Sequence, residues 1–200
     1  PMQILDCKPG QFFHLLCPRT GRDQPFLRRP MSVYRVDAAR ERIEFLYKPV
    51  GAGTAAMAML RPGDAFNVLG PLGKGFRLDA SWRHIVVLGR GVGLATLAPL
   101  AELAASMNIG VTAILSVERA EYVMSVSLFE AAGADVVSVT DEDGSSSVEN
   151  VGQILERLVA AGRVDGFFTC GSDRLMQLVK RLAGQYRIPG QVALEQQMAC

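Results

Sequence analysis

The sequence predicts two parts of different fold class: an antiparallel β-barrel over residues 1–80, then an α/β domain with a parallel sheet over residues 81–190. Three observations predict this division. Short β-type runs separated by Gly and Pro turns fill the first part. Apolar strand runs alternate with helical runs in the second part, which is the order that gives a parallel sheet with right-handed crossovers. The pattern changes near Ser81-Trp82.

The predicted barrel strands are short, and turn dipeptides such as Pro9-Gly10 and Pro62-Gly63 separate them. One helix interrupts the strands at Thr54–Leu60, which is rich in Ala and Met, and Thr54 is expected to be its N-cap. The strands are expected at Gln11–Leu16, Met31–Val36, Arg42–Lys48 and Ala65–Leu69.

The second part is expected to be built from strand–helix pairs. The run His84–Leu88 is typical of a buried parallel strand, and the polar residues 141–147 are expected to form a surface loop. Further strands are expected at Val111–Val117, Asp135–Val139 and Gly166–Thr169, and helices at Leu94–Met107, Glu121–Ala132, Val148–Ala161 and Asp173–Gly184.

Composition narrows the functional classes. Lys and Arg number 21 against 20 Asp and Glu, so the net charge of +1 gives no electrostatic reason to expect a nucleic acid or an anionic membrane as partner. No apolar run approaches the roughly 20 residues that span a bilayer, so no membrane insertion is expected. The four cysteines contain no C-x-x-C pair, which argues against a zinc knuckle or a disulfide scaffold and predicts a cytoplasmic protein.

A glycine-rich turn, Gly89-Arg90-Gly91-Val92-Gly93, follows the first predicted strand of the α/β part. Glycines at such a turn let the backbone approach a ligand closely and aim free N–H groups at a phosphate. The third glycine comes one residue too early for a G-x-G-x-x-G motif, and a tight turn without a ligand is the competing interpretation. Phosphate or dinucleotide binding is favoured because strand, glycines and helix occur in the right order.

A second turn, Thr169-Cys170-Gly171-Ser172-Asp173, follows the last predicted strand. Because the carboxyl ends of parallel strands share one rim of the sheet, this turn and the first one should lie together. The competing interpretation is a capped turn, with Ser172 or Asp173 as N-cap and Cys170 merely buried. The histidines His14 and His84 both lie in predicted strands, where a structural role is more common than a catalytic one.

Two segments of the barrel indicate another anionic ligand. Arg28-Arg29-Pro30-Met31-Ser32 enters a strand, where its arginines can either face solvent or hold a pyrophosphate while Ser32 bonds a ring nitrogen. In residues 47–54 a strand ends, glycines turn and a short helix starts, which can form an anion cradle. Together the two segments predict a second phosphate-bearing ligand.

The order of these motifs resembles the ferredoxin–NADP reductase superfamily, and within it the electron-transfer subunit of dihydroorotate dehydrogenase. The resemblance covers nearly the whole chain. It rests on Pro9-Gly10-Gln11-Phe12, Arg29-Pro30-Met31-Ser32, Gly51-Ala52-Gly53-Thr54, Leu69-Gly70-Pro71-Leu72-Gly73, Gly89–Gly93 and Cys170-Gly171-Ser172. It implies an FAD-binding barrel, a nucleotide-binding domain for NAD(H), and an oxidoreductase that passes electrons to a catalytic dehydrogenase subunit or another acceptor protein in pyrimidine biosynthesis. An oligomer is expected.

The resemblance also implies the site residues. No acid or base is needed for hydride transfer between a nicotinamide and a flavin, so the implied residues position the cofactors, with Ser32 near the reactive flavin nitrogen and Cys170 near the nicotinamide. The implied FAD residues are Arg29, Pro30, Met31, Ser32, Leu46, Tyr47, Lys48, Gly53 and Thr54. The implied nucleotide residues are Gly89, Gly91, Gly93, Cys170 and Gly171.

The sequence departs from the family pattern in three places. A first barrel strand before Pro9 is missing, and Arg90 puts a bulky charge where the family has glycine. In the family, a segment like Leu194–Cys200 leads into cysteines that ligate a [2Fe-2S] cluster, and Cys200 would be its first ligand. The three further cysteines are absent, so residues 191–200 are expected to begin a segment that a longer chain completes.

The nucleotide and the partner leave alternatives open. Glu118 after the second α/β strand favours NAD through a ribose hydroxyl, whereas Arg119 favours NADP through a 2′-phosphate, and the resemblance favours NAD. The alternative functions are another reductase-type flavin subunit, as in a ferredoxin:NAD(P) or sulfide oxidoreductase, and a regulatory module that binds a nucleotide without turnover.

Overall fold

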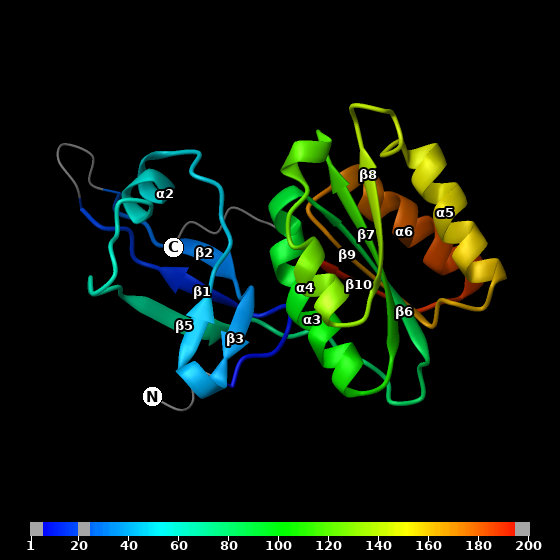
Figure 1. Cartoon of the computed structure of the whole chain (residues 1–200), viewed down its shortest axis with the longest axis horizontal. Coiled ribbons are helices and arrows are strands. Elements are labelled where there is room, and N and C mark those ends of the chain that lie inside the picture. The colour runs from blue at the N-terminus through cyan, green and yellow to red at the C-terminus, as the bar shows by residue number, and fades with distance from the viewer. Residues whose placement is uncertain (1–5, 20–24, 195–200) are drawn as a thin grey trace.

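The computed structural model describes residues 6–19 and 25–194, which form two parts side by side (Figure 1). The first part holds an antiparallel sheet in the order β2-β1-β5 and a separate ribbon of β3 and β4. Its elements are β1 Phe12–Leu15, β2 Arg29–Ser32, β3 Arg35–Asp37, β4 Arg42–Glu44, helix α2 Ala52–Met57 and β5 Val68–Leu72.

The second part is a five-stranded parallel sheet in the order β10-β9-β6-β7-β8. Its strands are β6 His84–Arg90, β7 Gly110–Val117, β8 Asp135–Thr140, β9 Gly166–Cys170 and β10 Gly190–Ala193. Its helices are α3 Leu94–Ser106, α4 Val126–Ala131, α5 Val148–Ala160 and α6 Asp173–Tyr186. The chain builds β7 and β8 on one side of β6 and then β9 and β10 on the other, so the strand order reverses between β6 and β9.

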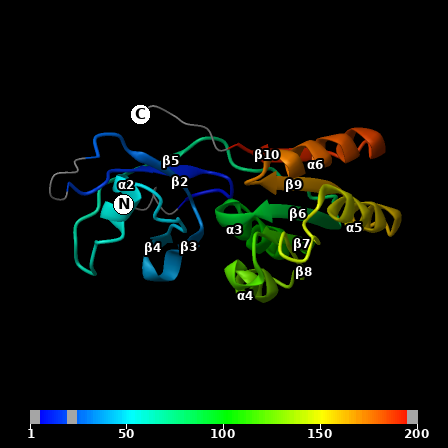
Figure 2. The ribbon, with the colours of Figure 1, turned by 90° about the horizontal axis from the view of Figure 1, so that it is seen from above.

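Helices cover both faces of this sheet, as Figure 2 shows. Helices α3 and α4 bury one face of β6, including Val87, in a cluster that also holds Phe168 of β9. Helices α5 and α6 bury the opposite face, including Val86 and Phe167. Side chains of a strand point alternately to the two faces, so continuous apolar runs are what a sheet buried on both faces requires. The predicted fold class is confirmed.

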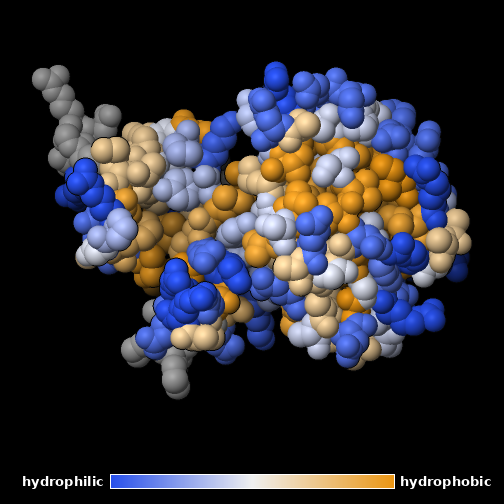
Figure 3. Space-filling model, viewed as in Figure 1, coloured by the Kyte–Doolittle hydropathy of each residue, from blue (hydrophilic) through white to orange (hydrophobic). Residues whose placement is uncertain are grey.

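The two parts meet at the carboxyl ends of β6 and β9, which point toward the barrel in Figure 2. Phe76, in the segment joining the parts, packs edge-on against Phe168 with ring centroids 5.4 Å apart. The hydroxyl groups of Tyr34 and Ser125 lie 2.9 Å apart across the interface. Figure 3 shows a notch between the parts along its upper edge, and apolar surface over β7 and β8, where β8 is an edge strand.

Several predicted boundaries in the barrel are wrong. The expected strand Met31–Val36 is two strands, because the Val33 N–H donates to Gln11 O while the Tyr34 N–H donates to Glu44 O, so the chain leaves one sheet for the other. Strand β4 ends at Glu44 rather than Lys48, and β5 covers Val68–Leu72 rather than Ala65–Leu69.

Thr54 is not the N-cap of the barrel helix. Helix α2 begins at Ala52 after Gly51, and Thr54 is its third residue. The Thr54 hydroxyl instead accepts the Val50 and Gly51 N–H groups at 2.9 and 3.2 Å, which ties the helix start to the preceding segment. A glycine N-cap has no side chain to reveal it in the sequence.

In the α/β part, β6 ends at Arg90 rather than Leu88, so Gly89 and Arg90 of the predicted turn belong to the strand, and two larger differences also occur. The expected helix Glu121–Ala132 is a single 3₁₀ turn, Ala120–Tyr122, followed by α4, because Ser125 adopts a left-handed φ of 67° that interrupts the helix. Strand β10 pairs with β9 through Ala193, so the sheet extends beyond the boundary expected at residue 190. No helix in residues 6–19 and 25–194 combines the length and apolar character needed to cross a bilayer.

Candidate functional site

Glycine is needed both near the end of β6, at Gly89, and in the turn that follows, at Gly91. Gly91 has φ +53°, and a Cβ there would meet no atom within 4 Å, so that side of the turn is open. A Cβ on Gly89 would lie 2.6 Å from Cδ2 of Leu94, because α3 starts directly against the strand end. The backbone therefore turns sharply from β6 into α3 and leaves an open surface at the turn.

The turn after β9 touches the first turn backbone to backbone. Gly171 has φ +89°, and a Cβ there would lie 2.3 Å from Arg90 O. A Cβ on Gly93 would lie 2.8 Å from Gly171 Cα and 2.9 Å from Cys170 O. Glycine at both positions is what lets the turns approach this closely. The two predicted turns thus share one rim of the sheet, at the point where the strand order reverses, which is where open α/β sheets bind ligands.

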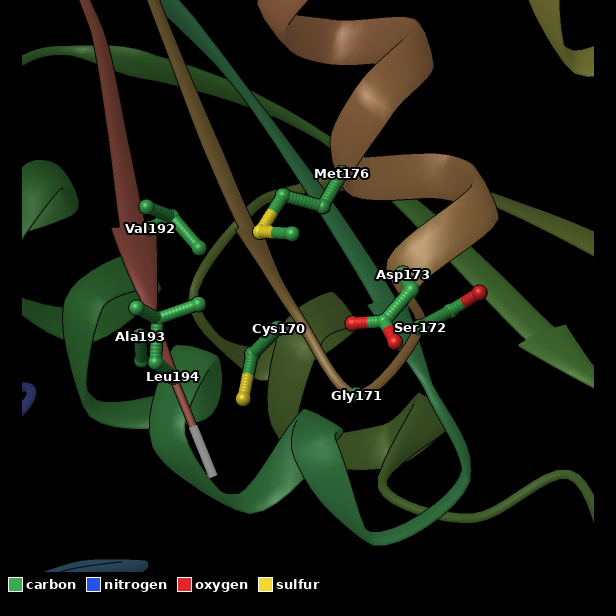
Figure 4. A pocket seen from close by; sticks show the side chains of 8 residues that line it. All are labelled: Cys170, Gly171, Ser172, Asp173, Met176, Val192, Ala193 and Leu194. Carbon is green, nitrogen blue, oxygen red and sulfur yellow. The ribbon is translucent and has the colours of Figure 1, made fainter. Parts of the chain in front are cut away.

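A cavity of about 220 Å³ opens beside this rim, between β9, β10 and the start of α6 (Figure 4). Ser172 is the N-cap of α6 and accepts the Leu175 N–H at 3.5 Å, as the capped-turn interpretation expected. The Cys170 side chain is 3% exposed and belongs to the core under α3. The lining residues are Cys170, Gly171, Ser172, Asp173, Met176, Val192, Ala193 and Leu194.

The charge of Arg90 is compensated within the rim. Its guanidinium bonds Ser116 Oγ at 2.9 Å and forms an ion pair with Asp141 at 2.5 Å. Arg174 holds the other oxygen of Asp141 at 2.9 Å, and Ser146 donates to the same carboxylate. Hydrogen bonds from Arg90 and then Ser146 lower the pKa of Asp141 to about 2, so the carboxylate stays ionised. Asp141 and Arg174 were not singled out from the sequence.

The residues that bear on nucleotide choice lie beyond β7. Arg119 is paired with Glu121 at 3.0 Å and with Glu142 at 3.7 Å, and all three side chains are about half exposed. Glu118 is exposed beside them, and its carbonyl accepts the Glu142 N–H at 3.1 Å. The Arg119 cation therefore pairs with two carboxylates, and the exposed Glu118 precedes it in the chain.

In the barrel, Arg29 and Gly53 lie directly against each other. A Cβ on Gly53 would fall 2.9 Å from Nε and from Nη2 of Arg29, and 2.9 Å from Cys17 Sγ. Within the described residues Arg29 has no carboxylate partner, and its Nη1 donates to the carbonyl oxygens of Leu27 and Arg28. The structure thus brings together a guanidinium and a glycine that lie 24 positions apart (53 minus 29) in the sequence.

The other barrel residues predicted to bind FAD lie on β2 and in the segment after β4, and most of them are half-buried. Pro30 and Met31 are half-buried on β2, and Leu46 and Tyr47 are half-buried in the segment after β4, whereas Lys48 is exposed. Met31 and Tyr47 pack on the same barrel core. Ser32 ends β2, and its Oγ accepts a hydrogen bond of 2.7 Å from Thr96 of α3. Thr96 was not singled out from the sequence.

The predicted metal ligand Cys200 lies outside the described residues. Within the described part of the chain, no group of three or more His, Cys, Asp or Glu side chains is placed to hold a metal ion. The described cysteines, Cys7, Cys17 and Cys170, therefore do not form a cluster site.

Comparison with known proteins identifies the family, although no family model matches the chain. The chain is 30% identical to the dihydroorotate dehydrogenase B (NAD(+)) electron transfer subunit of Desulforamulus reducens, over 96% of this chain and 72% of that protein. It is 31% identical to the same subunit of Enterococcus faecalis, over 96% and 73%. The probable subunit of Methanothermobacter thermautotrophicus is 32% identical, over 98% and 69%.

Solved structures agree on the fold. The NADH-dependent reduced ferredoxin-NADP oxidoreductase matches with a TM-score of 0.80 and 23% identity, over 98% of this chain and 69% of that chain. The ferredoxin-NADP+ reductase of Plasmodium falciparum matches with a TM-score of 0.68 and 10% identity, over 94% and 84%. The resemblance predicted from the sequence is confirmed, and this chain belongs to the family of dihydroorotate dehydrogenase B (NAD(+)) electron transfer subunits, oxidoreductase subunits with a ferredoxin reductase-like fold.

Proposed function

We propose that this chain binds FAD on the barrel and NADH at the rim of the parallel sheet, and that it passes electrons to a catalytic dehydrogenase subunit. One observation carries the proposal. Ser32, the residue expected to bond the flavin ring, accepts a hydrogen bond from Thr96, which lies three positions after Gly93 of the nucleotide turn. The two expected sites therefore meet at one interface, as a reaction between two bound cofactors requires.

The barrel residues fit a bound FAD. Among the residues that the structure describes, the Arg29 guanidinium has no carboxylate partner, and it lies against Gly53, which has no side chain to block access; this arrangement suits a pyrophosphate. Arg29 would neutralise that pyrophosphate with help from Lys48, while Gly53 and Thr54 would let it approach the backbone. Ser32 would donate to the flavin ring, and Pro30, Met31, Leu46 and Tyr47 would form its walls.

The rim residues fit a nicotinamide nucleotide. Gly89, Gly91 and Gly93 would receive the nucleotide phosphates along the open side of the turn, and Gly171 keeps the neighbouring turn close enough to share the ligand. Cys170 would pack beneath the nicotinamide as part of a buried apolar floor. FAD, when bound, accepts hydride from NADH and passes electrons onward. The protein supplies alignment, because this transfer needs no side-chain acid or base.

Local charge favours NAD over NADP. Two carboxylates, those of Glu121 and Glu142, pair with the Arg119 cation, and the exposed Glu118 precedes it in the chain. A 2′-phosphate at this place would meet net negative charge, whereas a ribose hydroxyl can donate to a carboxylate. We expect kcat/KM to be higher for NADH than for NADPH. The double variant Glu121→Gln/Glu142→Gln should narrow that ratio by relieving the repulsion, and an unchanged ratio would count against this assignment.

The proposal extends to the partner subunit, to the iron–sulfur cluster and to the cellular location of the protein. The curated relatives are electron transfer subunits of dihydroorotate dehydrogenase B, which supports a catalytic dehydrogenase subunit as the electron acceptor here. A [2Fe-2S] cluster would need ligands outside the described residues, so no step is assigned to it. We also propose the domain division at residue 80, with the α/β part extended to Ala193 by β10. Oligomeric and cytoplasmic states stay predictions.

The visible spectrum and cofactor content of the purified protein test the proposal. We expect a yellow protein from which heat releases FAD in about equimolar amount. The regulatory-module alternative expects nucleotide binding by a colourless protein. A protein that neither retains FAD on purification nor binds added FAD would overturn the proposed function.

A further inference from the structure

The hydrogen bond between Thr96 and Ser32 is partly buried and is formed between the two parts of the molecule. Thr96 is the third residue of α3, its side chain is 3% exposed, and its Oγ1 lies 2.7 Å from Ser32 Oγ. The two residues are 64 positions apart and belong to different parts of the molecule. The contact joins the helix that starts at the nucleotide turn to the strand end that carries the expected flavin ligand.

The residues next to Thr96 along α3 are apolar. Its helix neighbours Leu94, Ala95 and Leu97 are all buried, with exposed fractions of 2% or less. A buried hydroxyl is unfavourable unless it has a partner, so an apolar residue would be the simpler choice for packing alone. A threonine in a helix commonly turns its hydroxyl back to the carbonyl one turn earlier. Here the hydroxyl reaches across the interface instead.

The bond fixes how Ser32 can act. A serine hydroxyl has one proton to donate and two lone pairs that accept. Because Thr96 donates to Ser32, one lone pair is used and the Ser32 proton stays available for another acceptor. Hydrogen bonds in a chain polarise one another, so an accepted bond makes Ser32 a stronger donor and holds its side chain in one rotamer.

We propose that Thr96 is a positioning residue for the flavin: it holds Ser32 Oγ as an oriented donor toward the flavin ring, from the helix that begins at the nucleotide turn. This inference rests on the proposed function, because it assigns Ser32 to bound FAD. Thr96 does not touch the reacting atoms in this account. Its effect on the flavin passes through Ser32 alone.

A double-mutant cycle tests this route. Thr96→Val removes the hydroxyl and keeps the branched shape, and Ser32→Ala removes the residue through which Thr96 should act. The readouts are the midpoint potential of bound FAD and the rate of its reduction by NADH. Loss of one hydrogen bond should slow reduction about three- to tenfold. The midpoint potential should shift in the same direction in both single variants. The double variant should match Ser32→Ala, because effects that share one route do not add.

Two further variants separate positioning from packing. Thr96→Ser keeps the hydroxyl and should restore the midpoint potential and most of the rate. Thr112→Val is the matched control: Thr112 is also buried, but its hydroxyl bonds His84 Nε2 at 2.9 Å at the opposite end of the sheet. That control should leave the flavin potential unchanged. If Thr96→Val does not fold, Thr96→Ala takes its place, because alanine suits this Ala-rich helix.

The outcomes keep the two proposals apart. A wild-type protein that does not bind FAD overturns the proposed function and this inference with it. A wild-type protein that binds FAD and is reduced by NADH, while Thr96→Val keeps the wild-type potential and rate, overturns the positioning role alone. Additive effects of Thr96→Val and Ser32→Ala would overturn it as well.

Discussion

The two expected phosphate sites of this molecule differ in how the charge of their arginine is paired. Arg29 in the barrel has no carboxylate partner among the described residues, and its guanidinium lies against Gly53. Arg90 at the sheet rim is bound to Asp141, which Arg174 holds from the other side. An uncompensated cation attracts a phosphate strongly, whereas a compensated one adds little beyond the backbone N–H groups. We infer that the barrel suits a resident cofactor and the rim a nucleotide that binds and leaves.

The largest expected effect comes from the rim. Gly171→Ala places a Cβ 2.3 Å from Arg90 O at a residue with φ +89°, so the two turns must move apart. Strain and displacement of this kind cost up to about 3 kcal/mol, or about 100-fold in kcat/KM for NADH. FAD content should stay at the wild-type level. Gly162→Ala is the control, because Gly162 also has a left-handed φ, of +66°, but has open space around it. Equal losses in both variants would contradict the assignment of the rim.

Changes in the barrel site should weaken the binding of FAD instead. Arg29→Ala removes a charge that no carboxylate of the described residues compensates. A charge-assisted hydrogen bond contributes about 1.5–3 kcal/mol, so FAD should bind about 10- to 100-fold more weakly. Gly53→Ala should act in the same way, because its Cβ displaces the Arg29 guanidinium. Equilibrium dialysis against FAD measures both. Arg40→Ala, an exposed arginine paired with Asp37, is the control. Wild-type affinity in Arg29→Ala would refute the barrel site.

A smaller effect is expected when the carboxylate partner of Arg90 at the rim is removed. Asp141→Asn removes the charge between Arg90 and Arg174 and keeps the size of the side chain. Exposed ion pairs are worth up to about 1 kcal/mol, so the freed cations should lower the KM for NADH about two- to fivefold. The gain should fade at high salt, which screens exposed charges. A KM that does not change would mean that Arg90 lies away from the bound nucleotide.

The smallest effect concerns pH and stability. Folding lowers the pKa of Asp141 from its ordinary 3.8 to about 2. A carboxyl group with a depressed folded-state pKa stabilises the fold above its unfolded pKa, and this stabilisation is lost as pH falls through the folded value. The difference in unfolding temperature between wild type and Asp141→Asn should therefore be constant above pH 3.8 and should shrink toward pH 2. A difference that grows on acidification would contradict this.

The elements that could be predicted from the sequence are those with a local pattern. Strand β6 and the glycine turn after it follow from a local apolar run and local glycines, and the observed strand starts at His84 as predicted. Strand β10 was missed, because Gly190–Ala193 is four residues with little apolar pattern. The interruption before α4 depends on a left-handed Ser125, which no local pattern reveals.

The pairs that define the site could not be predicted, because they join distant residues. Thr96 and Ser32 are 64 positions apart, and Arg90 and Asp141 are 51 apart. Each residue alone looks ordinary in the sequence: a threonine in an apolar helix, and an aspartate in a polar loop. The unexpected charge of Arg90 was visible from the sequence, but its carboxylate partner appeared only in the folded structure.

If FAD on the barrel and NADH at the rim react across the interface, NADH should reduce the bound flavin directly. An anaerobic titration of the FAD-loaded protein with NADH, followed by the visible flavin absorbance, tests it most directly. We expect the absorbance to bleach, with an end point near one NADH per flavin. An FAD-loaded protein that neither NADH nor NADPH reduces would contradict the account.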